Sequence, residues 1–386
     1  MQDVTTRPLK ELAVPKGLIG GPFGSNLGRA DYTESGVPVI RGQNLSGIGS
    51  FSSHDFVYVS EEKANRDLSR NLALPNDVVF TQRGTLGQVG IVPSEPYERY
   101  VISQSQMRLR VDSSRTDSRY VYYCFRDPAM VARIHARAIT TGVPHINLGI
   151  LADLPIPVHP LPAQQAIAEV LGALDDKIAV NERIAATSLN LGGALLEKAV
   201  QEESSDTSIG GIAELIYGKS LPEPKRRAGD APVFGCTGQV GWHDTPLTPS
   251  RGPVVGRKGA NAGHVSWMSS PGWVIDTAFY ARPLSSDIPV ETLYFILNSA
   301  GLKSLIGDSA VPGLNRDLAL RCRIRIPAAR LMSGFRDKAR GLLNTSVHIE
   351  AENHALANLR NTLIPQLITG KIHVKDAVRV VEDIAS

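Results

Sequence analysis

LPAQQAIAEVLGALDDKIAVNERIAATSLNLGGALLEKAVQ, residues 161–201, is the stretch on which the fold depends. Apolar residues recur in steps of four, three and four, at Ile167, Leu171, Leu174 and Ile178. This spacing places them on one side of a helix. A helix of this length spans about 55–60 Å, which exceeds the core of an ordinary domain. The stretch therefore predicts a spacer helix, whose apolar seam needs a partner helix.

The partner lies in the same chain. A shift of 168 positions, the distance from Ile167 to Phe335, brings a second apolar seam into register with the first. The match extends upstream of both helices, where the sequence PHIN ends at Asn147 and PGLN ends at Asn315. Because one register holds through turn, strand and helix, the chain is a tandem repeat of a globular part and a long helix. Both asparagines are expected to cap or turn the chain.

Length and composition bound the class of protein. With 386 residues the chain is long enough for two or three domains, and 42% hydrophobic and 20% charged residues are ordinary for a soluble globular protein. A net charge of +3 permits a nucleic-acid partner without arguing for one. No signal peptide or transmembrane run is apparent, so no membrane association is expected. Cys124, Cys236 and Cys322 are few and far apart, which fits a reducing cytoplasm and offers no metal knuckle.

Two β-hairpins with basic tips are predicted. Apolar runs at 78–80 and 89–92 flank Gln82, Arg83, Gly84 and Thr85. In the second half the stretch VVGRKGANAG, with Arg257, Lys258 and Asn261, repeats this arrangement. Each basic tip is either a solvated turn or a DNA contact, and its recurrence in both halves favours DNA contact.

Other polar groups are weaker candidates. Arg41 and Asn44 follow the short strand signal VPVI, where they can read a base edge or simply form a turn. Lys219 and the cluster Lys225, Arg226 and Arg227 are phosphate contacts or flexible basic loops. The alternation of Arg321, Arg323 and Arg325 with apolar residues indicates a strand with one basic face.

Local patterns give further expectations. Residues 17–30 are glycine-rich and suggest a flexible loop, and residues 120–135 suggest one helix. Ser60, with two glutamates after it, predicts a helix start. The last helix is expected to end at Pro365 and Gly370.

Signals for catalysis are weak. Gly218, Lys219 and Ser220 look like the end of a phosphate-binding loop, but the earlier glycine and the preceding strand are lacking. Asp55, Glu61 and Lys63 can be arranged as a metal nuclease site, whereas a capped helix start explains Glu61 equally well. No group has the spacing of a catalytic centre, so neither a catalytic nor a metal site is assigned.

Several motifs together resemble the specificity subunits of type I restriction–modification systems. They include GPFGSNLGRADYTESGVPVIRGQNL, PNDVVFTQRGTLGQVGIV, LPIPVHPLPAQQAIAEVLGALDDKIAVNERI, VFGCTGQVGWHD, VVGRKGANAG, WVIDTAFY and LIPQLITGKI. The resemblance covers nearly the whole chain in order. One departure is that the first helix begins with Pro162 and Gln164, whereas the second has Ala328-Ala329-Arg330 at its start. Because of this difference, the second helix can start differently from the first, and the partner subunits can dock on the two helices in unequal ways.

The resemblance implies an α+β fold with two mixed α/β target-recognition domains, joined by two long antiparallel helices in a pseudo-twofold tandem repeat. We expect domains at 1–158 and 204–327, with spacer helices at 159–203 and 328–386. It also implies a non-catalytic, cytoplasmic subunit that reads a split site in double-stranded DNA. Two methyltransferase subunits and motor–nuclease subunits are the implied protein partners. These partners, rather than this chain, would hold S-adenosylmethionine, ATP and magnesium.

The expected DNA-binding residues are Arg41, Asn44, Gln82, Arg83, Thr85, Lys219, Lys225, Arg226, Arg257, Lys258 and Asn261. Two other functions remain open. One is a stand-alone nuclease with its own recognition domains, which would cut DNA without a partner. The other is an assembly scaffold in which one recognition domain has lost its DNA contact.

Overall fold

The computed structural model describes residues 4–45, 50–53, 55–306 and 312–385. The chain divides into two compact units. The first unit comprises Met1–Val180 and Glu352–Ser386, and the second comprises Asn181–Ala351. Each unit contains a globular part and a portion of both long helices, α5 (Leu161–Glu202) and α9 (Ala329–Ile368). The domain boundaries expected from the sequence, which separate helices from globular parts, stay predictions.

The first globular part is built on two sheets. Its antiparallel sheet has the order β2 (Ala13–Gly20), β10 (Gln106–Val111), β7 (Val78–Thr81) and β8 (Val89–Ile91). The other sheet has the order β3 (Tyr32–Thr33), β5 (Val57–Val59), β4 (Val37–Ile40), β9 (Tyr100–Ile102) and β6 (Leu72–Ala73). In addition, β1 (Thr5–Pro8) pairs with β11 (Pro155–Val158).

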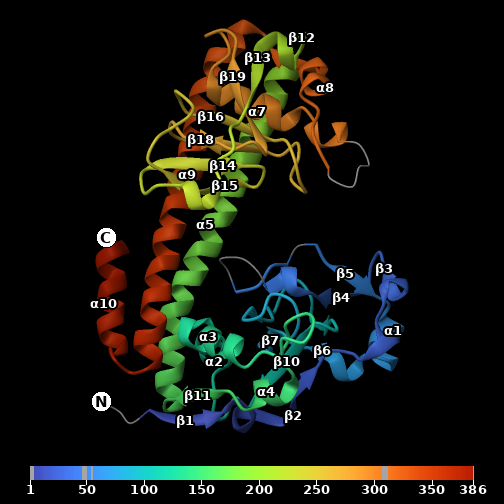
Figure 1. Cartoon of the computed structure of the whole chain (residues 1–386), viewed down its shortest axis with the longest axis vertical. Coiled ribbons are helices and arrows are strands. Elements are labelled where there is room, and N and C mark those ends of the chain that lie inside the picture. Colours follow the sequence, from blue (N-terminus) through green and yellow to red (C-terminus); the bar gives the residue numbers. More distant parts are fainter. Residues whose placement is uncertain (1–3, 46–49, 54, 307–311, 386) are drawn as a thin grey trace. The chain divides into compact units, whose positions relative to one another are not determined.

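Four short helices complete the first globular part. They are α1 (Glu61–Arg66), α2 (Ser118–Arg126), α3 (Pro128–Ala136) and α4 (Leu148–Ala152). Ser60 caps α1 as predicted, because its hydroxyl accepts from the Lys63 N–H at 3.1 Å. The single helix expected at 120–135 is two helices, because Asp127 caps α3 and Pro128 occupies its first position. Figure 1 shows α2 and α3 between the strands and α5.

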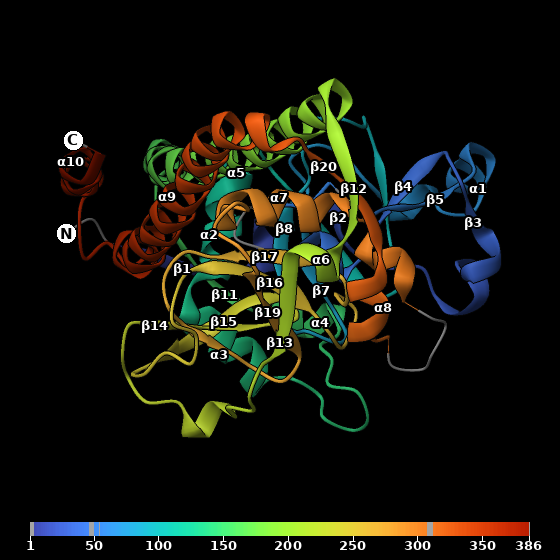
Figure 2. The same cartoon turned by 90° about the horizontal axis from the view of Figure 1, so that it is seen from above.

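The second globular part repeats this plan. Its four-stranded sheet has the order β13 (Ala213–Tyr217), β19 (Ala278–Pro283), β16 (Gly252–Gly256) and β17 (Val265–Met268). A smaller sheet has the order β15 (Gly238–His243), β14 (Ala231–Gly235) and β18 (Trp273–Val274), and β12 (Ser204–Ser208) pairs with β20 (Arg323–Pro327). The short helices are α6 (Ile209–Ile212), α7 (Val290–Ser299) and α8 (Arg316–Arg321). Figure 2 shows α7 across β16 and β17.

The two four-stranded sheets have equivalent strand orders, since β2, β10, β7 and β8 correspond to β13, β19, β16 and β17. The predicted hairpins are present as the antiparallel pairs β7–β8 and β16–β17. The caps are repeated as well, because Asn147 caps α4 and Asn315 caps α8 through their side-chain oxygens. The prediction of an α+β fold with two mixed domains and two long helices is therefore confirmed.

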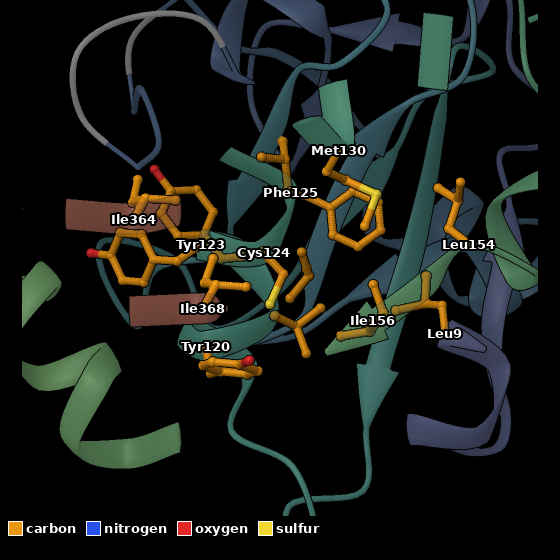
Figure 3. Close-up of a cluster of buried hydrophobic side chains, with 14 of the residues drawn as sticks. Leu9, Tyr120, Tyr123, Cys124, Phe125, Met130, Leu154, Ile156, Ile364 and Ile368 are labelled. Carbon is orange, nitrogen blue, oxygen red and sulfur yellow. The ribbon is translucent and has the colours of Figure 1, made fainter. Parts of the chain in front are cut away.

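The long helices complete the core of each unit. In the first unit the start of α5 packs against the end of α9, with Ile167 and Leu171 in one buried cluster with Ile364 and Ile368. In the second unit the end of α5 packs against the start of α9, so the helices run antiparallel. Figure 3 shows Tyr123 of α2 beside Ile364 and Ile368 in the first core.

Two sequence expectations about local structure are wrong. Residues 17–20 belong to strand β2 rather than to a flexible loop. Leu18, Ile19 and Gly20 pair with residues 109, 108 and 107 of β10. Arg321 ends helix α8, so only Arg323 and Arg325 lie exposed on β20. Ser208 and Asn147 cap the short helices α6 and α4.

Pro365 does not end the last helix, which continues to Ile368. Proline within a helix costs about 3 kcal/mol, because it removes one backbone hydrogen bond. Ile364, Leu367 and Ile368 are fully buried around it, and each such side chain contributes about 1.5–3 kcal/mol. Gly370, with φ of +69°, does end the helix. A further helix, α10 (Val374–Ala385), was not expected, although Ala377 is buried in the first core.

Candidate nucleic-acid interface

The hairpin tip of the first unit is held by two other segments of the chain. The Gln82 N–H donates to the Ser105 carbonyl at 2.7 Å, and the Ile146 N–H donates to the Gln82 carbonyl at 2.9 Å. The Gly84 N–H points to the Pro144 carbonyl at 3.5 Å. Gly84 has φ of +100°, which favours glycine and lets the chain turn sharply after Arg83.

The second unit builds its tip with the same hydrogen bonds. The Arg257 N–H donates to the Thr277 carbonyl at 2.8 Å, and the Leu314 N–H donates to the Arg257 carbonyl at 2.8 Å. The Gly259 N–H donates to the Pro312 carbonyl at 2.9 Å, and Gly259 also has φ of +100°. Arg83 is therefore structurally equivalent to Lys258, and Gln82 to Arg257.

Arg83 and Lys258 are exposed cations on rigid supports. Both side chains face solvent, and neither makes a hydrogen bond or ion pair within the described ranges 4–45, 50–53, 55–306 and 312–385. Their backbones are fixed, since Arg83 bridges His145 and Lys258 bridges Gly313. A fixed backbone with an unengaged cationic side chain suits an anionic ligand, because little ordering of the main chain is needed on binding.

A polar hollow of about 410 Å³ lies beside Arg83 in the first unit. Thr85, Gln43 and Gln88 line it, together with Gly42, Thr81, Ser105 and Gln106. None of these lining residues is acidic. The hollow therefore joins an arginine to amide and hydroxyl groups, which are the side chains that read base edges. Sequence reasoning missed Gln43 and Gln88.

Arg41 is half-buried beside this hollow. Its guanidinium Nη2 donates to the Asp55 carbonyl at 2.7 Å, and Gln43 Nε2 donates to the same carbonyl at 2.8 Å. The Arg41 Nε is buried without a hydrogen-bond partner among the described residues. Arg41 therefore anchors the segment that carries Gln43.

Asn44 was expected to contact DNA, and this stays a prediction. Its side chain is fully buried. The Asn44 Oδ1 accepts from the Arg41 N–H at 2.9 Å, and its Nδ2 donates to the Ser52 carbonyl at 3.0 Å. The amide is used to close the turn after β4 and cannot reach a base edge without breaking it.

Arg257 is held by its neighbours in the second unit. Its guanidinium lies 4.8 Å from the centre of the Tyr217 ring and donates to the Asp276 carbonyl at 3.0 Å. Arg316 lies 5.1 Å from the same ring. Sequence reasoning missed Tyr217 and Arg316, although Arg316 directly follows the repeated Asn315. Arg257 is thus mainly a support for the tip, while Lys258 next to it remains exposed.

The other basic candidates of the second unit are spread out. Lys219 is exposed at a hollow of about 240 Å³ that Tyr217 and Arg282 also line. Lys225 is exposed, whereas Arg226 is half-buried and donates to the Val240 carbonyl at 2.6 Å. Arg226 is therefore a structural contact of its loop.

Asn261 is exposed at the second tip, close to Lys258. The Cys236 thiol lies beneath these two residues. Burial raises the pKa of Cys236, and hydrogen bonds with the backbone of Asn261 and Lys258 partly oppose this. Burial, followed by the charge of Lys303, lowers the pKa of His264 in the same hairpin. Because both shifts favour the neutral forms, the fixed charge of the tip comes from its lysine and arginine.

The proposed nuclease grouping is not assembled. Glu61 pairs with Arg99, and Lys63 pairs with Asp31 at 3.1 Å and with Asp67 at 3.2 Å. Over the described ranges, no three His, Cys, Asp or Glu side chains are placed to hold a metal ion. The three cysteines are free thiols. Among the described helices, none is both long and apolar enough to cross a membrane.

Sequence comparison shows what most of the first unit is similar to. Residues 20–187 match the family described as the Type I restriction modification DNA specificity domain. The match covers 168 of the 386 residues and shows what this segment is similar to. The resemblance found in its motifs is thereby confirmed, and the first hairpin tip with its polar hollow lies inside the matched segment. A search of curated proteins found no match to the chain.

Several solved structures are similar to the chain. The S subunit of a type I restriction–modification system from M. genitalium is 20% identical, with a TM-score of 0.54, over 95% of this chain and 97% of that chain. The HsdS subunit from Thermoanaerobacter tengcongensis is 13% identical, with a TM-score of 0.40, over 96% and 98%. A chain from the type I R-M system is 14% identical, with a TM-score of 0.42, over 95% and 98%. The first comparison supports the same fold over nearly the whole chain, outside the matched segment as well.

Proposed function

We propose that this chain is the DNA-recognition subunit of a type I restriction–modification complex and reads a bipartite site in double-stranded DNA. The first specificity domain would read one half of the site, and the second unit would read the other half. The observation that carries the proposal is the duplicated hairpin tip, with Arg83 or Lys258 exposed on the same set of backbone hydrogen bonds.

The two tips would contact DNA differently. An arginine forks onto the edge of guanine, so Arg83, exposed at the first tip, suits base reading. A lysine more often holds phosphate, so Lys258, with Lys219 and Lys225 elsewhere in the unit, suits positioning on the backbone. In the second unit, Asn261 is the exposed amide next to the tip.

We further propose that the chain scaffolds two methyltransferase subunits and the motor–nuclease subunits, without catalysis of its own. S-adenosylmethionine, ATP and magnesium would be held by those partners. A DNA-processing assembly with three free thiols belongs in the cytoplasm.

Sequencing of methylated bases in the native genome tests the proposal. Deleting the gene should abolish methylation at one motif made of two short specific parts and a non-specific gap. An unchanged methylation pattern would contradict it. Loss of a motif with only one specific part would indicate a scaffold in which one unit no longer reads DNA.

The nuclease alternative has its own test. The purified chain, incubated with magnesium and plasmid DNA in the absence of any partner, should leave the DNA intact. Cleavage by the chain alone would favour a stand-alone nuclease.

A further inference from the structure

A buried polar network joins both long helices to the globular part of the first unit. Asp175 on α5 pairs with Arg360 on α9 and accepts a hydrogen bond from the Tyr123 hydroxyl on α2 at 2.7 Å. The three residues are only 2–6% exposed. Figure 3 shows Tyr123, one member of this network, beside the apolar residues Ile364 and Ile368. Each of the three elements thus contributes one member.

The equivalent place in the second unit is apolar. The 168-residue register puts Leu343 of α9 at the position of Asp175 and Gly192 of α5 at the position of Arg360. Helices α2 and α7 follow the equivalent strands β10 and β19, and alignment of their first residues, Ser118 and Val290, puts Phe295 at the position of Tyr123. Leu343 and Phe295 are 1% exposed, and the Phe295 ring leaves no room for a side chain at residue 192, where a Cβ would lie 2.2 Å from it. All three network members are therefore replaced together.

A neighbouring contact differs between the units in a similar way. In the second unit Glu291 of α7 is buried and pairs with Arg340 of α9 at 3.3 Å and with Arg251 at 2.6 Å. At the corresponding places the first unit has Arg119 on α2 and Gly172 on α5, and Arg119 closely covers Gly172. The charge on the globular part is thus reversed. The partner on the helix changes as well, from Arg340 to Asp176 of α5, whose carboxylate lies 3.8 Å from the Arg119 guanidinium. The two junctions are chemically distinct throughout.

We propose that the Tyr123–Asp175–Arg360 network makes helix pairing in this chain selective, so that α5 accepts α9 and rejects a second copy of α5. The repeat makes such a rejection necessary, because the two helices share a common apolar seam. In an antiparallel pair of two α5 helices, Asp175 would face Gly192 and remain buried without its arginine. In a pair of two α9 helices, Arg360 would face Leu343 and remain buried without its carboxylate.

The physical basis is the cost of the wrong pairs rather than the strength of the right one. A buried ion pair contributes little net stability, because desolvation offsets the attraction, whereas a buried charge without a partner is strongly unfavourable. The preference for the α5–α9 pair can therefore come from the free-energy cost of the α5–α5 and α9–α9 pairs. When α5 pairs with α9 of the same chain, the molecule contains one copy of each recognition unit. The network would thus prevent assemblies in which two copies of the same unit are joined.

The test uses the full chain with the first junction converted to the residues of the second. The variant Tyr123→Phe/Asp175→Leu/Arg360→Gly is coexpressed as two copies with different affinity tags. Capture on one tag should recover the other tag about tenfold more than for the natural chain, because the penalty on like pairing is gone. Light scattering should show dimers. Since this readout needs no DNA, it is independent of the proposed function.

Two controls separate selectivity from loosening of the core. Leu363→Ala removes a side chain of the same core and keeps the network, so it should leave cross-capture at the natural level. A second version, Tyr123→Phe/Asp175→Leu/Arg360→Leu, fills the volume of the arginine and should behave like the first. The proposal is overturned if either version folds with cross-capture at the natural level. It is also overturned if neither version folds, because the network would then serve stability.

Discussion

At the scale of residues, each hairpin tip contains side chains that hold the turn in place and side chains that remain exposed for binding. Gln82 and Arg257 occupy equivalent places, and their backbones make equivalent hydrogen bonds. Arg257 also stacks on Tyr217, whereas the next residue, Lys258, stays exposed. An arginine in a promising motif is therefore not by itself a DNA contact.

Arg257→Ala should destabilise the second unit by about 1–2 kcal/mol, because it removes the contact with the Tyr217 ring and the hydrogen bond to Asp276. Urea unfolding measures this loss. Lys258→Ala, one residue away, is the matched control and should leave the midpoint unchanged. Equal midpoints for the two variants would show that the stacking of Arg257 has no energetic weight.

Asn44→Ala should cost about 1–3 kcal/mol of stability, since it leaves the Arg41 N–H and the Ser52 carbonyl without their amide partner. Thermal unfolding of the full chain measures this. The exposed amide at Asn261 provides the comparison, because Asn261→Ala should unfold at the natural temperature. A variant at Asn44 that keeps full stability but loses DNA binding would support the original prediction.

At the scale of elements, the turns after Arg83 and Lys258 depend on glycine. Gly84→Ala and Gly259→Ala each place a Cβ on a backbone with φ of +100°, which costs about 1–3 kcal/mol. Open space surrounds the Cβ position at Gly84, so backbone strain alone would act there. We expect each variant to destabilise the chain by a similar amount in urea unfolding. Gly193→Ala, at an open position within α5, is the control and should not destabilise the chain. If Gly84→Ala is as stable as the natural chain, the backbone at the tip adopts another conformation without cost, and the expectation is contradicted.

Much at this scale was predictable from the sequence, for identifiable reasons. The seam at Ile167 and the repeated Asn147 and Asn315 gave the helices, the caps and the tandem repeat, because periodicity and capping are local. The continuation of α9 past Pro365 was not predictable, because burial of Ile364 and Ile368 outweighs the local preference of proline. The stacking of Arg257 on Tyr217 joins residues 40 positions apart, so no local pattern indicates it.

At the scale of the whole molecule, we expect the long helices to set the gap between the two DNA half-sites. Four residues inserted after Val180 in α5 and after Ala351 in α9 lengthen the pair by about 6 Å, since these are the points where each helix passes between units. The preferred gap should grow by about one or two base pairs, at about 3.4 Å each. Methylation of a plasmid library with variable gaps measures this.

A two-residue insertion at the same points is the control. It rotates the following seam by about 200°, so it should destabilise the chain rather than shift the gap. A folded four-residue variant with an unchanged gap would contradict the role of the helices as a spacer.

The most direct test of the account is a binding selection with the chain and its methyltransferase partner on DNA in which each half-site is randomised in turn. Arg83→Ala should relax one half-site at one base position, at a cost of about 1–3 kcal/mol, and leave the other half unchanged. Lys258→Ala should leave that first half-site intact and weaken binding in a salt-dependent manner through the other half. If both variants relax the same half-site, or relax both halves equally, the two units are not separate readers and the account is contradicted.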